Sequence, residues 1–203
     1  MSTFVLYFGG WLASLPDVKT WMASARHQSP GVTFDAYPYP ANTSSNGGEA
    51  VTNFTAAGDL AKAVNQVQSS TADTIYIVGH SSGCAIANAV EAHVKDHTRT
   101  ILVALDGYCP SAAQLARPGT QVWVAESRLG KSLHYDDLKR SVNDYDLKNK
   151  DWVWVNIHHA PPDCTTKLSL HFSLVNLSAS DDLVKFIPDG YKNCEANLSF
   201  LNP

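Results

Sequence analysis

The most constraining feature of this sequence is an apolar run that ends in a glycine-flanked serine and continues directly into small residues. Residues 74–78 are β-branched or aromatic, residues 79–83 read Gly-His-Ser-Ser-Gly, and residues 84–87 read Cys-Ala-Ile-Ala. This succession predicts a strand, a sharp turn and a helix, with Ser81 at the apex. Glycine at 79 and 83 leaves room where side chains would collide with the neighbouring strand and helix. A plain capping serine has no need of both glycines, so the pattern indicates a nucleophile.

A nucleophilic serine also needs donors for the oxyanion that forms when it attacks a carbonyl carbon. The backbone N–H of Ser82 lies in the first turn of the expected helix, where the helix dipole favours negative charge. The second donor should come from the loop after the first strand, through the backbone N–H of Gly10 or Trp11. We expect these groups to form an oxyanion hole, with an ordinary strand-end turn as the alternative for residues 9–11.

The composition predicts one globular domain, residues 1–203, because 44% of its residues are apolar and only 17% are charged. A formal charge of −4 without a basic run gives no support to nucleic-acid or anionic-membrane binding. The four cysteines are widely spaced and form no Cys-x-x-Cys pair, which favours reduced thiols in the cytoplasm. The apolar residues 4–13 lack a preceding basic residue and contain glycine and tryptophan, so we interpret them as a strand and not a signal peptide.

Apolar runs alternate with amphipathic segments along the whole chain. The expected strands are residues 3–8, 32–37, 74–78, 100–105, 121–125 and 152–157. The first expected helix begins at Leu15, and further helices are expected at residues 51–69, 82–96, 111–116 and 183–187. A lid-like segment is expected within residues 128–150. This alternation predicts an α/β fold with about six mostly parallel strands and helices on both faces. Ligands of such sheets bind at the carboxyl ends of the strands, where Ser81 and Asp106 both fall.

A serine nucleophile requires a base and a carboxylate that orients the base. Asp106 follows the expected strand at 100–105 directly and is the favoured acid, although an Asp-Gly turn is also compatible with it. Glu126 follows the next strand and is its rival. Each candidate follows a strand at the carboxyl edge of the expected sheet, so the residues alone do not decide which of the two is the acid.

Eight histidines compete for the role of base. His171 is favoured and His159 is the alternative, because both follow the last expected strand, where the base belongs in the order serine, acid, histidine. His80 lies within the turn and is expected to point away from Ser81 in a structural role. A metal site built from Cys164 and the neighbouring histidines matches no regular zinc spacing, and a serine nucleophile needs no metal, so we expect neither metal nor cofactor.

Three segments resemble the thioesterase branch of the α/β-hydrolases, the domains that release acyl chains from polyketide and peptide assembly lines, and their type II relatives. They are the turn at 79–83, residues 103–110, which read Val-Ala-Leu-Asp-Gly-Tyr-Cys-Pro, and the His-Phe pair at 171–172. The resemblance implies a single-domain, shortened α/β-hydrolase fold that lacks the family's leading antiparallel hairpin. It also implies Asp106 as the acid and His171 as the base.

The expected function is cleavage of an acyl thioester or carboxylic ester through a Ser81 acyl-enzyme, on a small-molecule acyl substrate carried by an acyl carrier or coenzyme A. Tyr39 and Tyr108 are the candidates for lining the acyl pocket. The chain also resembles small serine hydrolases of the retinoblastoma-binding-protein-9 kind, which carry the acid after the later strand, where this chain has Glu126. A general carboxylesterase of that kind is therefore one alternative, and a non-catalytic hydrolase-fold binding protein is another.

Overall fold

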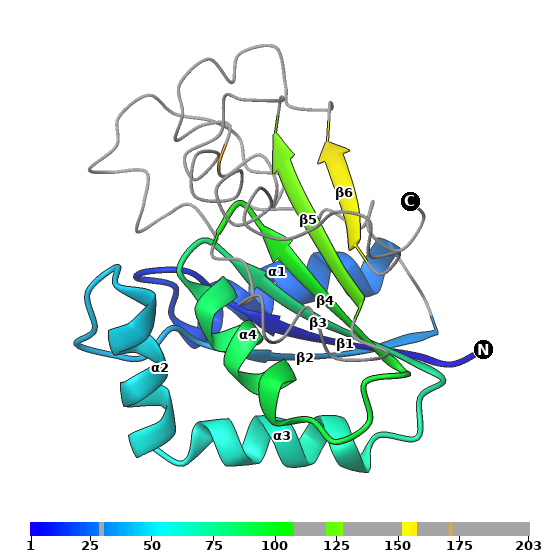
Figure 1. The fold of residues 1–203 in the computed structure, drawn as a ribbon. Coiled ribbons are helices and arrows are strands. Elements are labelled where there is room, and N and C mark those ends of the chain that lie inside the picture. Colours follow the sequence, from blue (N-terminus) through cyan, green and yellow to red (C-terminus); the bar gives the residue numbers. More distant parts are fainter. Residues whose placement is uncertain (29–30, 108–120, 128–151, 158–170, 172–203) are drawn as a thin grey trace.

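A computed structural model of the chain describes residues 1–28, 31–107, 121–127, 152–157 and the single residue His171. Strands and helices alternate through these residues (Figure 1). The strands are β1 (Thr3–Phe8), β2 (Val32–Tyr37), β3 (Thr74–His80), β4 (Thr100–Leu105), β5 (Gln121–Ser127) and β6 (Trp152–Ile157). The helices are α1 (Leu15–Gln28), α2 (Gly47–Ala56), α3 (Asp59–Ser69) and α4 (Gly83–His93).

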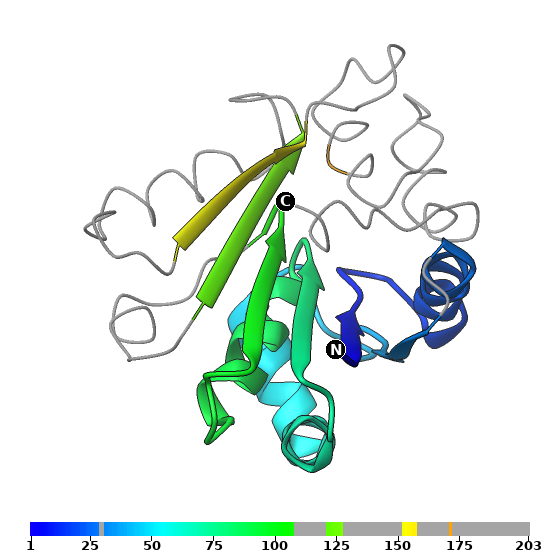
Figure 2. The ribbon, with the colours of Figure 1, turned by 90° about the vertical axis from the view of Figure 1, so that its right-hand side faces the viewer.

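The described strands form one sheet in the order β2-β1-β3-β4-β5-β6, and every neighbouring pair is parallel. The chain runs outward from β1 to β2 and then returns to β3 and continues the other way. Because such crossovers are right-handed, this reversal puts α1 on one face and the later helices on the other (Figure 2). The predicted parallel α/β arrangement is confirmed. The reversal lies between β1 and β3, and the crevice at their carboxyl ends is where such sheets bind ligands.

Consecutive residues of β1 bury aromatic side chains on opposite faces of the sheet, as the two-residue repeat of a strand requires. Tyr7 packs against Trp21 of α1, with ring centroids 4.2 Å apart. Phe8 packs edge-on against Phe54 of α2 at 5.9 Å. Both strand residues are fully buried, so each face of the central strand is covered by its own helical layer.

The prediction of one helix over residues 51–69 is wrong, because Gly58 interrupts it. Gly58 has a φ of 76° and separates α2 from α3. A residue in this left-handed region ends one helix, and glycine adopts it without steric cost. Helix α2 also begins earlier than expected, at Gly47, where the Asn46 side chain accepts hydrogen bonds from the Gly48 and Glu49 backbone N–H groups.

Other boundaries differ from the sequence prediction by a few residues. Strand β3 continues to His80, β5 continues to Ser127, and α4 ends at His93. The expected helices at 111–116 and 183–187 and the lid-like segment at 128–150 lie outside the described residues. Among the helices that the structure describes, none combines the length and the apolar character needed to cross a membrane.

Gly83, the first residue of α4, allows the helix to begin against the end of β1. A Cβ at this position would lie 2.4 Å from the Gly9 carbonyl oxygen and 2.6 Å from the Phe8 carbonyl oxygen. Neither backbone oxygen can move without disturbing the sheet. We therefore expect Gly83→Ala to lower the free energy of unfolding by about 3 kcal/mol, at the upper end of overpacking costs.

The same substitution in the first turn of α2 provides the control for this stability prediction. A Cβ on Gly48 would lie 3.3 Å from Oδ1 of the Asn46 side chain, which is able to shift. Gly48→Ala is thus expected to change stability by no more than about 1 kcal/mol. Urea titration of both variants measures the difference, and equal unfolding midpoints would contradict the close approach at Gly83.

Candidate functional site

The predicted strand, turn and helix around the serine are present, and the turn holds Ser81 in a strained conformation. Its φ is 56°, a left-handed value that costs a non-glycine residue about 1–2 kcal/mol. The Ser81 N–H donates to the Leu105 carbonyl over 3.0 Å, and the Ser81 carbonyl accepts from the Cys84 N–H over 3.0 Å. The first hydrogen bond ties the turn to β4, and the second begins α4 directly after it.

The turn after β4 lies against the serine turn. A Cβ on Gly107 would lie 2.1 Å from the Ser81 carbonyl oxygen and 2.4 Å from Cys84 Sγ, so no side chain fits there. The preceding residue, Asp106, also has a positive φ, of 44°. The structure therefore brings the predicted acid and the predicted nucleophile to the same edge of the sheet, on adjacent strands.

The predicted acid and base are hydrogen-bonded to each other. His171 Nδ1 lies 2.6 Å from Asp106 Oδ2, and both residues are buried, with exposed fractions of 2% and 0%. A carboxylate that accepts from a ring N–H fixes the tautomer and the orientation of the imidazole. In catalytic triads an imidazole that is held at Nδ1 in this way exchanges protons through Nε2.

His171 also contacts the turn itself through His80, the residue before Ser81. His80 Nε2 lies 3.1 Å from the His171 carbonyl oxygen, and the two ring centroids are 4.4 Å apart. The base is thus held next to the serine turn by one contact and to Asp106 by the other. The sequence did not indicate the contact between the two histidines, since nothing in the pattern relates residues 91 positions apart.

Of the residues predicted for the oxyanion hole, Ser82 is the N-cap of α4. It is buried, and its hydroxyl donates to the Ser45 carbonyl over 2.8 Å. The loop after β1 approaches the same helix end at Gly83, as described above. Within that loop Gly10 is buried, whereas Trp11 is 39% exposed. The role of the Gly10 and Trp11 N–H groups stays a prediction.

The remaining predicted site residues are Tyr39, Tyr108, Glu126 and His159. Tyr39 is buried in the hydrophobic core, and its hydroxyl donates to the Ser44 carbonyl over 2.7 Å. Tyr108, His158, His159 and Cys164 lie outside the described residues. For Glu126 the structure describes only its place in β5. The pocket role of both tyrosines and the candidacy of Glu126 and His159 therefore stay predictions.

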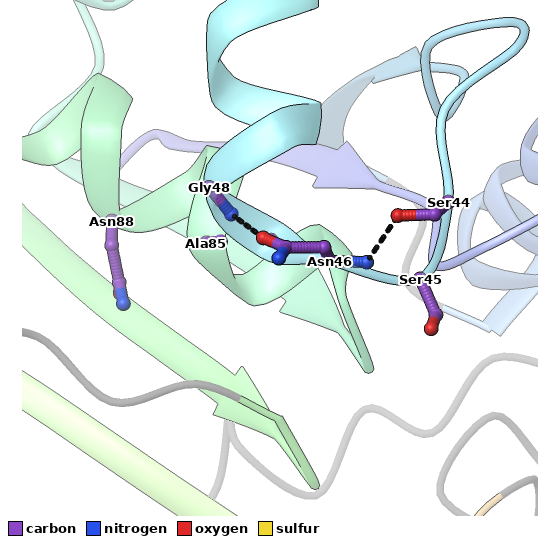
Figure 3. Close-up of a pocket in the computed structure, with 7 residues that line it drawn as sticks. Ser44, Ser45, Asn46, Gly48, Ala85 and Asn88 are labelled. Atoms are coloured by element: carbon purple, nitrogen blue, oxygen red, sulfur yellow. Dashed lines mark hydrogen bonds between the residues drawn. The ribbon is translucent and has the colours of Figure 1, made fainter.

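A cavity of about 600 Å³ lies beside the serine helix, between α4 and the residues that lead into α2 (Figure 3). Its lining residues are mostly small or polar: Ser44, Ser45, Asn46, Gly47, Gly48, Ala85 and Asn88. Ala85 and Asn88 follow Ser81 by about one and two helical turns, so they lie on one side of α4. The sequence predicts a plain loop at residues 42–48 and not a cavity, although the Asn, Ser and Gly content marks a turn that exposes backbone.

No protein-family model and no curated protein matches the sequence. Among solved structures, an uncharacterized protein from Bacillus cereus ATCC 10987 is similar in fold, with a TM-score of 0.54 and 11% identity. That match covers 80% of this chain and 56% of the Bacillus cereus chain, so this chain spans little more than half of that protein.

Two further structures are similar at lower scores. One is a candidate hydrolase of the alpha/beta superfamily from Xanthomonas campestris pv. campestris, with a TM-score of 0.47, 13% identity and coverage of 77% of this chain and 86% of that one. The other is an alpha-beta serine hydrolase homologue from Coxiella burnetii, with a TM-score of 0.46, 16% identity and coverage of 76% and 74%.

Proposed function

We propose that this chain is a serine hydrolase of the α/β-hydrolase type that cleaves an acyl thioester or carboxylic ester through a Ser81 acyl-enzyme. The observation that carries the proposal is the buried pair of Asp106 and His171, joined over 2.6 Å, at the sheet edge where Ser81 occupies a strained turn. The residues follow the chain order serine, acid, histidine that α/β-hydrolases use. Core packing alone makes no demand for a carboxylate, an imidazole and a strained serine at one place.

In the proposed reaction His171 Nε2 takes the proton of the Ser81 hydroxyl as Oγ attacks the substrate carbonyl carbon. The tetrahedral intermediate then collapses, the bond to the leaving thiol or alcohol breaks, and His171 returns the proton to that leaving group. Water repeats the sequence on the acyl-enzyme and releases the carboxylic acid. Asp106 stabilises the imidazolium that exists between these steps, and burial of the pair strengthens that interaction.

The negative charge of the tetrahedral intermediate is assigned to the Ser82 backbone N–H and to the N–H of Gly10 or Trp11. Support comes from the position of Ser82 at the start of α4, where N–H groups and the helix dipole favour an anion. The loop after β1 meets the same helix end, since Gly83 has no room for a side chain against the Gly9 carbonyl.

The proposed substrate class is an acyl group on a thiol or alcohol, with a carrier protein or coenzyme A as the thiol. This choice rests on the resemblance of residues 79–83, 103–110 and 171–172 to thioesterases. The cavity between α4 and α2 offers space for part of such a substrate. Parallel assays with p-nitrophenyl acyl esters and acyl-coenzyme A separate ester from thioester preference.

Labelling with a fluorophosphonate tests the proposed nucleophile directly. We expect one label per chain, and peptide mass spectrometry should find it on the peptide that contains Ser81, because an activated serine attacks the reagent while ordinary serines do not. Heat-unfolded protein is the control and is expected to take up no label. Absence of labelling in the native protein, or a label on another serine, would contradict the proposal and favour a non-catalytic binding protein.

A further inference from the structure

His80 is a buried histidine directly before the serine turn, with no exposed surface. It is the last residue of β3 and immediately precedes Ser81. Its imidazole is 0% exposed and meets Trp21 of α1 edge-on, with centroids 6.4 Å apart and ring planes at 74°. A buried polar ring is costly unless its nitrogens find partners, so the identity of those partners matters.

One partner of His80 is the backbone of His171. The distance from His80 Nε2 to the His171 carbonyl oxygen is 3.1 Å. A carbonyl oxygen only accepts, so Nε2 must carry the proton and His80 must donate it. The imidazole of His80 also lies against the imidazole of His171, with centroids 4.4 Å apart and ring planes inclined by 32°. A single side chain thus contacts both the backbone and the ring of His171.

We propose that His80 is a positioning residue that fixes His171 relative to Ser81, an inference that rests on the proposed function. Asp106 holds Nδ1 of the base, and a hydrogen bond at one atom does not by itself fix the plane of a ring. The His80 contacts at the carbonyl and at the ring face restrain that plane. Displacement of a reacting group by about 1 Å lowers turnover by about 10²-fold, so this restraint has a measurable effect.

The restraint is specific because His80 and Ser81 are consecutive residues. The hydrogen bond from His80 therefore ties the backbone of the base to the backbone of the nucleophile through one imidazole. Ordinary core packing at this position requires only an apolar ring. The positioning role also requires an N–H donor at the position of His80 Nε2. Substitutions that keep or remove this donor therefore distinguish the positioning role from core packing.

The variants His80→Phe and His80→Gln test this requirement. Phenylalanine keeps an aromatic ring and loses the donor, whereas glutamine places an amide N–H the same number of bonds from Cβ as His80 Nε2. We expect His80→Phe to lower kcat by about 10²-fold with KM unchanged. His80→Gln is expected to restore most of that loss. Circular dichroism and thermal unfolding establish that equal amounts of folded protein are compared.

His93, the last residue of α4, provides a matched control. His93 Nδ1 contacts the Ala89 carbonyl oxygen over 2.7 Å at the exposed far end of α4. His93→Phe removes a ring-to-carbonyl hydrogen bond of the same kind, and we expect kcat to stay at the wild-type value. If His80→Phe does not fold, His80→Asn replaces it, since its amide N–H is one bond too short to reach the His171 carbonyl.

Proton NMR gives a readout that does not depend on turnover. The short Nδ1–H hydrogen bond from His171 to Asp106 is expected to give a low-field proton resonance. His80→Phe should shift or broaden this signal and His80→Gln should preserve it. Wild-type kcat and resonance in His80→Phe would overturn the positioning role, as would equal losses in His80→Phe and His80→Gln. Failure of the wild-type protein to react with ester or fluorophosphonate overturns the proposed function instead, and the resonance still reports the contact.

Discussion

Ser81→Ala is expected to lower kcat for ester or thioester hydrolysis by about 10⁶-fold, the loss seen when a serine nucleophile is removed from an intact triad. The reason is that, in the proposed mechanism, Asp106 and His171 form no covalent bond with the substrate and act only on the serine proton. The residual rate comes from binding and the oxyanion donors. Initial rates with a p-nitrophenyl acyl ester and with acyl-coenzyme A measure the effect.

Two further substitutions separate lost chemistry from lost folding. Ser81→Gly also removes the hydroxyl, but glycine adopts the φ of 56° without strain, so this variant should be inactive and at least as stable as Ser81→Ala. Ser69→Ala changes an exposed serine at the end of α3 and should keep wild-type activity. Substantial turnover by Ser81→Gly would show that another residue is the nucleophile.

The serine turn could be predicted from the sequence because its determinants are local. A glycine near the end of β3, a serine with a left-handed φ, and a glycine that starts the next helix all lie within five residues. The β1 and β4 boundaries were predicted for a similar reason, since each strand is a threonine followed by a continuous apolar run. Because 65 residues separate Asp106 from His171, no local pattern relates them. Their pairing was predicted instead from the chain order and from the resemblance to thioesterases.

Features that depend on distant contacts were not predictable in this way. The helical periodicity continues across Gly58, so the break between α2 and α3 becomes visible only when its φ of 76° is known. The contact between His80 and His171 joins residues that lie 91 positions apart in the sequence. No sequence pattern therefore indicated a partner for His80, and its place within the turn predicted only a structural role.

The choice between the two acid candidates gives the second large expected effect. Asp106→Asn should lower kcat by about 10⁴-fold. An amide N–H facing His171 Nδ1 makes Nδ1 the acceptor and places the ring proton on Nε2. A protonated Nε2 cannot accept the proton of the serine hydroxyl. Asparagine tolerates a left-handed conformation, so the φ of 44° at this position does not itself penalise the substitution. Thermal unfolding of the variant checks that the buried site still forms.

Glu126→Gln is the matched control for Asp106→Asn, since both replace a carboxylate by its amide near the carboxyl end of a strand. We expect it to leave kcat close to the wild-type value, because the hydrogen bond to His171 Nδ1 is supplied by Asp106. The opposite result, a large loss in Glu126→Gln and a small one in Asp106→Asn, would place the acid after β5. The bond between Asp106 and His171 would then be structural, and the likeness to thioesterases would give way to the small carboxylesterase alternative.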